Sequence, residues 1–291
     1  MNPTVQITDE DVAHFKTKGW LRMDAITTPD EVERLRGIFD RLFEERAGWE
    51  RGRSFDMVGN DAREQKPRLA QILRPTDFAP ELNDIAFRAN AMEIARRLLG
   101  PGTEPWFEHA ILKPARDGAA TPWHQDEAHR YDAEVEYEQL SIWMPLQPAT
   151  EENGCISYIT GSHQGPVLEH RPLGGDPRKP ALECIGNFDP ALAEPCPLPP
   201  GGAAIHHGRT IHGAGANATD APRRAYILAF RGPMRPVPGG KLHPWNEGKR
   251  TAAAERAQAW ENRGGPIGKA ARRVSKLAER AIGRLRRIIR G

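Results

Sequence analysis

The sequence predicts a mostly β protein with flanking helices, in which the strands form a double-sheet jelly roll. From about residue 104 to 232, short runs rich in Trp, Ile, Leu and Tyr alternate with Pro, Gly and Asn, which is typical of strands and loops. Residues 5–100 instead carry helical periodicity and capping signals. Many short antiparallel strands with long loops suit a jelly roll, the architecture that also holds metal centres in cupins.

Two helix starts are marked in the N-terminal part. Thr8, with Asp11 three residues later, resembles a capping box. Thr28 precedes Pro29 and two acidic residues, which supplies a cap and a proline that favours the first helical turn. Apolar residues then recur at helical spacing over residues 32–42. We expect a helix after each threonine.

The remaining elements follow from local patterns. A third helix is expected over residues 80–99, and the clearest strands are residues 140–146 and 225–230. Asn153 and Gly154 form a turn signal before the next apolar run. The proline-rich stretch over residues 173–200 predicts a long loop over the site rather than a second domain.

Length and composition favour one domain. At 291 residues and 38% hydrophobic content, the chain can bury one large core. Its three cysteines, Cys155, Cys184 and Cys196, are odd in number and have no framework spacing, and the first residues lack the regions of a signal peptide. No run approaches the roughly 18 to 20 apolar residues that span a bilayer. A cytoplasmic protein is therefore expected.

Charge is distributed unevenly along the chain. Residues 269–291 hold nine Lys or Arg side chains against one Glu, a local charge of +8, so the rest carries about −6 of the net +2. The apolar residues of this tail fill one arc of a helical wheel, which predicts a basic amphipathic helix over about 267–290. Such a helix lies on an anionic membrane surface or packs on the protein body or a second subunit. Nucleic acid is not expected, because no aromatic residue is interleaved for stacking.

One group of residues has the composition of a metal site. His124 and Asp126 are spaced two apart, so on a strand both point to one face and can reach one ion. His212 must arrive from another segment, and Arg223 follows it by eleven residues. Two imidazoles and one carboxylate, with the other positions open, are the ligand set of non-haem Fe(II) oxygenases.

These motifs are similar to those of the phytanoyl-CoA dioxygenase family. The similarity is carried by residues 121–128, by residues 152–163 and by residues 212–217 with the arginine at 223, and it extends over roughly residues 5–232. Members are Fe(II)- and 2-oxoglutarate-dependent oxygenases with a double-stranded β-helix core and helices packed outside. The resemblance implies a single oxygenase domain over residues 1–240, with a helical part over 5–100 and a jelly-roll core over about 104–232. Residues 241–291 would form a C-terminal extension.

The resemblance also implies the roles of the site residues. His124, Asp126 and His212 would bind Fe(II), and no catalytic residue is expected beyond these ligands. Arg223 would hold the far carboxylate of the co-substrate 2-oxoglutarate as a bidentate fork, and Trp143 stands where the family places an aromatic beside it. With O2, such a site hydroxylates an aliphatic C–H bond and releases succinate and CO2. The expected substrate is a small or lipid-linked molecule, and fold does not specify which.

The pocket around the metal is predicted less sharply. A position that is often serine in the family is Ala214 here, which leaves Thr210 as a donor beside the arginine and costs about 0.5 to 1.5 kcal/mol of co-substrate binding. His109, Lys113 and His129 are further pocket candidates, although Lys113 is equally expected to be a solvated side chain.

Other polar residues near the motifs have structural interpretations. His206 and His207 lie close to His212 in sequence, but neither is followed by an arginine at the matching spacing, so they are expected to support the wall of the site. His163 belongs to a Gly-Ser-His turn that the family uses structurally. Arg224 should face the opposite side of the strand from its neighbour.

Two other functions are compatible with the sequence. One is a cupin-like metal-binding protein without oxygenase activity, which absence of 2-oxoglutarate turnover across many substrates would favour. The other is a membrane-surface interaction protein that acts through its basic tail, which would place it at the inner face of a membrane. Deleting residues 267–291 separates these, because an enzyme keeps 2-oxoglutarate binding whereas a tethering protein loses its only activity.

Overall fold

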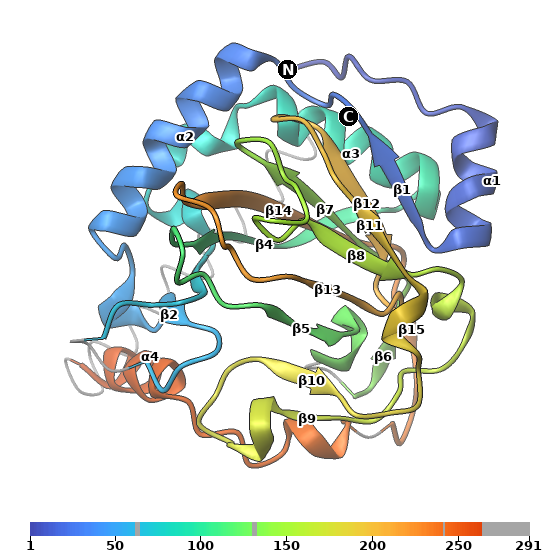
Figure 1. The fold of residues 1–291 in the computed structure, drawn as a ribbon. Coiled ribbons are helices and arrows are strands. Elements are labelled where there is room, and N and C mark those ends of the chain that lie inside the picture. The colour runs from blue at the N-terminus through green and yellow to red at the C-terminus, as the bar shows by residue number, and fades with distance from the viewer. Residues whose placement is uncertain (62–64, 130–132, 241, 264–291) are drawn as a thin grey trace.

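Two antiparallel sheets face each other in the computed structural model, which describes residues 1–61, 65–129, 133–240 and 242–263 (Figure 1). The larger sheet has the order β1-β12-β7-β14-β4-β3-β2, and the smaller has the order β11-β8-β13-β5. This arrangement confirms the predicted mostly β fold with flanking helices and a jelly-roll core. The larger sheet consists of β1 (Trp20–Met23), β2 (Ser54–Asp56), β3 (Ala70–Leu73), β4 (Glu104–Lys113), β7 (Gln139–Pro145), β12 (Ala203–His207) and β14 (Arg223–Arg231).

Shorter ladders complete the β structure. The smaller sheet consists of β5 (Thr121–His124), β8 (Ile156–Ile159), β11 (Ala193–Cys196) and β13 (His212–Ala214). Two separate two-stranded ladders pair β9 (His170–Pro172) with β10 (Leu182–Cys184), and β6 (Val135–Glu136) with β15 (Arg235–Pro236). The helices are α1 (Asp9–Lys18), α2 (Pro29–Glu44), α3 (Ala86–Leu99) and α4 (Ala252–Asn262).

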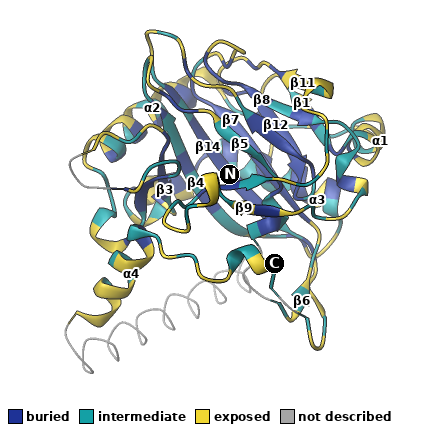
Figure 2. Ribbon diagram, turned by 60° about the horizontal axis from the view of Figure 1, so that its bottom comes forward, coloured by how far each residue is buried: buried dark blue, intermediate teal, exposed yellow. Residues whose placement is uncertain are grey.

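The larger sheet separates two cores because side chains alternate along its strands. On β7, Leu140 and Ile142 pack in a core with residues of α2 and α3. Trp143, the next residue after Ile142, faces the opposite side of the sheet and packs with Ile156 and Tyr158 of β8. The central strands are buried along their length, whereas α2 and α4 expose one face to solvent (Figure 2). The face of the larger sheet that carries Trp143 is therefore the one that lines the site.

The first two helices begin where the sequence predicts. The Thr8 hydroxyl accepts the N–H of Asp11 at 3.1 Å, and the Asp11 carboxylate accepts the N–H of Thr8 at 2.9 Å, a complete capping box. The Thr28 hydroxyl accepts the N–H of Glu31 at 3.2 Å, and Pro29 is the first helical residue of α2. Local sequence alone therefore accounts for both starts.

The predicted start of the third helix at residue 80 is wrong. Residues 80–83 form a 3-10 turn, and α3 begins at Ala86. The reason is tertiary: the Glu31 carboxylate accepts the N–H groups of Ala86 and Phe87, each at 2.8 Å. A side chain from α2 thus caps α3, so the boundary depends on residues 55 positions away.

Two further expectations need correction. The part predicted as helical, residues 5–100, also contributes β1, β2 and β3 to the larger sheet. These strands have only three or four residues, and β1 pairs with the distant β12, so no local periodicity marks them. The stretch 173–200 is likewise not one loop, because it contains β10 and β11.

The C-terminal extension is described as far as residue 263. The predicted basic helix over about 267–290 lies outside the described residues, so that helix, its membrane contact and the cellular location stay predictions. Within the described ranges, no helix is both long and apolar enough to cross a membrane.

Candidate metal centre

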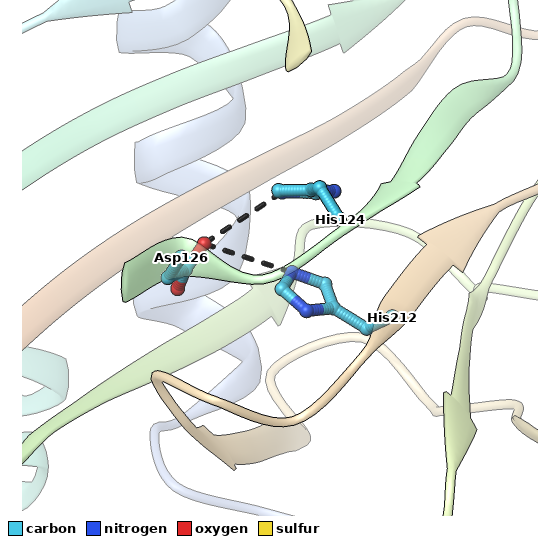
Figure 3. Close-up of side chains that lie close together, drawn as sticks. All are labelled: His124, Asp126 and His212. Carbon is cyan, nitrogen blue, oxygen red and sulfur yellow. Dashed lines mark ion pairs between the residues drawn. The ribbon is translucent and has the colours of Figure 1, made fainter. Parts of the chain in front are cut away.

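The three predicted ligands meet between the two sheets (Figure 3). His124 ends β5 and His212 begins β13, and the two are direct partners in the antiparallel register. One carboxylate oxygen of Asp126, Oδ1, lies 3.6 Å from His124 Nε2 and 3.7 Å from His212 Nε2. One potential ligand atom from each residue lies within 4.8 Å of the others. The donor set and its spacing therefore suit a single metal ion.

The expectation that one strand carries both His124 and Asp126 is wrong in detail. Strand β5 ends at His124, and Asp126 is the first residue of a 3-10 turn, η4 (Asp126–His129). The turn, rather than strand alternation, brings the carboxylate back beside the imidazoles.

Backbone carbonyls fix how both imidazoles are presented. His124 Nδ1 lies 2.8 Å from the carbonyl oxygen of Pro122, and His212 Nδ1 lies 2.9 Å from that of Thr210. Because a carbonyl only accepts, each Nδ1 carries the proton and each Nε2 keeps its lone pair for a metal. Burial lowers the pKa of both histidines, which keeps the rings neutral. Neutral imidazoles are the form that binds a metal ion.

Asp126 is held from behind by two side chains. Its other oxygen, Oδ2, accepts a hydrogen bond from Ser141 Oγ at 2.6 Å and one from His206 Nε2 at 3.2 Å. Burial alone would raise the pKa of Asp126, but the His206 hydrogen bond and the neighbouring histidines hold it well below the usual value. Tyr158 extends this row of hydrogen bonds, since its hydroxyl lies 3.1 Å from His206 Nδ1. The carboxylate is therefore ionised, with Oδ1 directed at the two Nε2 atoms.

A cavity of about 90 Å³ adjoins the three ligands, and Arg223 lies at its wall. Arg223 is only 2% exposed, and within the described residues its Nε and Nη1 have no hydrogen-bond partner. The guanidinium lies 5.2 Å from the ring centre of Trp143. Burial lowers the pKa of Arg223 to about 10, which leaves it charged at neutral pH. The other lining residues are Met57, Leu69, Gln71, His109, Ile111, Thr121, Pro122, His129, Ser141, Ile156, Ala181, Leu182, His206, Gly213, Ala214 and Ile227.

A buried guanidinium without a partner is unfavourable unless an anion joins it. A carboxylate could accept hydrogen bonds from this guanidinium, as in charged arginine–carboxylate pairs. The cavity thus combines a metal-binding triad and an unsatisfied cation, which are the two contacts that a keto-dicarboxylic acid needs.

A model of the phytanoyl-CoA dioxygenase (PhyH) family matches residues 15–225. The chain belongs to this family. Among its relatives, phytanoyl-CoA dioxygenase domain-containing protein 1 of Danio rerio is 24% identical over 263 residues, covering 76% of this chain and 89% of that protein. A probable alpha-ketoglutarate-dependent hypophosphite dioxygenase of Stutzerimonas stutzeri is 27% identical over 166 residues, covering 56% of this chain and 57% of that one.

Solved structures agree with this assignment. EvdO2 from Micromonospora carbonacea var. aurantiaca is 40% identical with a TM-score of 0.73, covering 84% of this chain and 99% of EvdO2. The complex of EvdO2 with 2-oxoglutarate gives 37% identity and a TM-score of 0.71. The predicted family and cofactors are confirmed: this family member is an iron- and 2-oxoglutarate-dependent dioxygenase.

Not all predicted pocket residues of this dioxygenase reach the cavity. His109 and His129 line it, but Lys113 and Thr210 do not. Lys113 is fully buried, and its Nζ donates to the backbone carbonyls of Ala214, at 3.3 Å, and Gly215. It is therefore neither a pocket residue nor a solvated one. The Thr210 hydroxyl donates to the carbonyl oxygen of Gly19 at 2.7 Å, so it is not available as a donor to the co-substrate.

The remaining polar candidates, His207, His163 and Arg224, do not line the cavity. His207 pairs with Glu138, and His163 Nε2 lies 3.0 Å from the carbonyl oxygen of Lys16. Arg224 pairs with Asp40, on the opposite face of β14 from the cavity. Each of these three side chains therefore connects two segments of the fold and has a structural role.

Sequence reasoning missed Gln71 at the cavity wall. It is 6% exposed and lies in register with Ile111 of β4, and its Oε1 has no partner among the described residues. His109 Nδ1, on the same face of β4, is unpartnered in the same sense, and burial lowers the pKa of His109 to about 4. A bound ligand would meet an amide and a neutral imidazole here. No signal marked Gln71, because β3 is too short to show a period.

Sequence reasoning also missed Ser141, although a signal was present. Ser141 precedes Trp143 by two residues on β7, so it shares the inward face, and it pairs in register with His206.

We expect Ser141→Ala to weaken metal affinity about tenfold, the lower end of the effect of losing a hydrogen-bond partner of a metal ligand. Calorimetric titration with Co(II) measures it. Ser157→Ala, on the face of β8 opposite Tyr158, should keep wild-type affinity, and equal losses in both variants would contradict the role given to Ser141.

Proposed function

We propose that this dioxygenase hydroxylates an aliphatic C–H bond of a small molecule whose reacting part is uncharged. His124, Asp126 and His212 would hold the iron, and Arg223 would hold the far carboxylate of 2-oxoglutarate. The observation that carries this proposal is the buried guanidinium at the wall of the cavity that the three ligands border, which has no hydrogen-bond partner in the part of the chain that the structure describes. When bound, iron and 2-oxoglutarate supply the oxidation, in which O2 gives one oxygen atom to succinate and one to the product, with release of CO2.

The tasks of the chain's own residues follow from their contacts. Arg223 would orient the co-substrate by the N–H groups that lack a partner among the described residues, and Trp143 beside it would exclude water from the carboxylate. Ser141 and His206 keep one oxygen of Asp126 directed at the metal position. None of these residues needs to transfer a proton to the substrate.

The remaining walls indicate the substrate's character. Beyond the ligands and the arginine, the lining is largely apolar, as at Met57, Leu69 and Leu182. Apart from His206, which hydrogen-bonds to Asp126, the ionisable residues there are His109 and His129, and burial lowers the pKa of each, so both are neutral at pH 7. A charged reacting group would find no counter-charge among these lining residues, so an uncharged one is favoured.

The experiment is aerobic turnover with Fe(II), 2-oxoglutarate and a panel of neutral small molecules under 16O2 or 18O2. Hydroxylation predicts a product heavier by one oxygen atom, labelled from 18O2, with one succinate formed for each product. A substrate that drives succinate formation but gains no oxygen would overturn the hydroxylation and leave the dioxygenase assignment intact.

A further inference from the structure

A segment beyond the family match packs against the turn that carries Asp126. The matched region ends at residue 225, and after β14 and β15 the chain returns beneath the smaller sheet, passing β9 on its way to α4 (Figure 1). We name residues 243–263 the C-terminal strap.

The strap makes two hydrogen bonds to one buried carbonyl. Trp245 Nε1 donates to the carbonyl oxygen of Ala128 at 3.0 Å, and Asn246 Nδ2 donates to the same oxygen at 2.8 Å. Ala128 is fully buried and lies in η4, two residues after Asp126. A short 3-10 turn has few internal bonds, so these contacts from outside restrict its position.

A second route leads from the strap to the same turn. The Trp245 indole packs on the His170 imidazole with 5.4 Å between ring centres. His170 Nδ1 lies 2.8 Å from the carbonyl oxygen of Leu168 and so carries the proton, which leaves Nε2 to accept the N–H of Gln125 at 3.2 Å. Gln125 stands between His124 and Asp126, so both routes from Trp245 end within two residues of a ligand.

The far end of the strap is firmly attached. The Arg256 guanidinium lies 3.5 Å from the ring centre of Trp49 and donates to the carbonyl oxygens of Trp49, at 2.9 Å, and Ser54, at 3.0 Å. It also pairs with the buried carboxylate of Asp61. Between the two ends, the N–H of Arg250 donates to the carbonyl of Pro177 at 3.0 Å. Trp245 is therefore held on a fixed support.

We propose that Trp245 is a positioning residue of the metal centre, which holds the η4 turn so that the Asp126 carboxylate faces the two histidines. It acts through Ala128 and His170 and touches neither metal nor substrate. The inference rests on the proposed ligands His124, Asp126 and His212, and it extends the support of the site to a segment outside the matched family region.

The test uses full-length variants that separate the contacts. Trp245→Phe keeps a ring over His170 but removes the N–H donor, and Asn246→Leu removes the other donor at similar size. Trp260→Phe, the same substitution on α4, is the matched control, since Trp260 packs between Arg51 and Arg263 instead. Co(II) affinity by calorimetry and the Co(II) absorption spectrum report the metal centre, and thermal unfolding of the metal-free protein reports the fold.

We expect Trp245→Phe to weaken Co(II) binding about fivefold, the factor of one neutral hydrogen bond. The variant that combines Trp245→Phe with Asn246→Leu should bind Co(II) more than about tenfold more weakly and show a shifted Co(II) spectrum, because both donors to Ala128 are lost. Trp260→Phe should bind Co(II) as the wild type does. If Trp245→Phe and Trp260→Phe lower the unfolding temperature alike and both keep wild-type affinity, the strap is only structural and the inference is overturned. If the wild-type chain binds no metal, the proposed ligand set fails first.

Discussion

Replacing His212 with alanine is expected to abolish 2-oxoglutarate turnover and to weaken Fe(II) binding by at least about a hundredfold. The reason is that His212 contributes one of three donors, and loss of even an outer partner of a metal ligand costs about 10- to 100-fold. Anaerobic metal titration and succinate formation measure the two effects. His207→Ala is the control, because this nearby histidine pairs with Glu138 instead of facing Asp126. Loss of metal binding in His207→Ala with retention in His212→Ala would contradict the site.

Arg223→Leu is expected to have opposite effects on binding and on stability. Removing one partner of a buried charge pair costs about 2 to 5 kcal/mol, so 2-oxoglutarate affinity should fall by roughly 30-fold to several thousandfold. Without co-substrate, the same change removes a buried charge that has no partner within the described ranges, so the metal-free protein should unfold at a higher temperature. Calorimetry and thermal unfolding measure these two quantities.

The neighbouring arginine supplies the control for this prediction. Arg224→Leu breaks a pair with the half-exposed Asp40 carboxylate, on the face of β14 opposite the cavity, and should leave 2-oxoglutarate affinity unchanged. Similar losses of affinity in both variants would show that the strand, and not the Arg223 guanidinium, governs co-substrate binding.

The two strands that carry Trp143 and Arg223 at the cavity wall were predictable because they are long and buried. Residues 140–146 and 225–230 were expected as strands, and the structure has β7 over Gln139–Pro145 and β14 over Arg223–Arg231. Their pattern contains enough apolar residues to be read locally. Strands β1 to β3 were not predictable, because three or four residues gain stability only from partners far along the chain.

The residues of the site likewise fall into a group that the sequence predicts and a group that it does not. His124, Asp126, His212 and Arg223 stand in motifs with fixed spacing, so the sequence indicated them together. The residues behind them depend on tertiary packing: Ser141 could be found from the alternation of β7, whereas Trp245 reaches Ala128 across 117 positions. Sequence spacing therefore predicts which atoms would touch the metal, and the fold decides what holds them.

Anaerobic addition of Fe(II) and 2-oxoglutarate to the wild-type chain tests the central claim most directly. The arrangement of the three ligands and Arg223 predicts a metal-to-ligand charge-transfer absorption that requires both additions. It should disappear in His212→Ala and need far more 2-oxoglutarate in Arg223→Leu. If Fe(II) binds but no such absorption forms at saturating 2-oxoglutarate, the co-substrate does not chelate the metal and the proposed oxygenase site is contradicted.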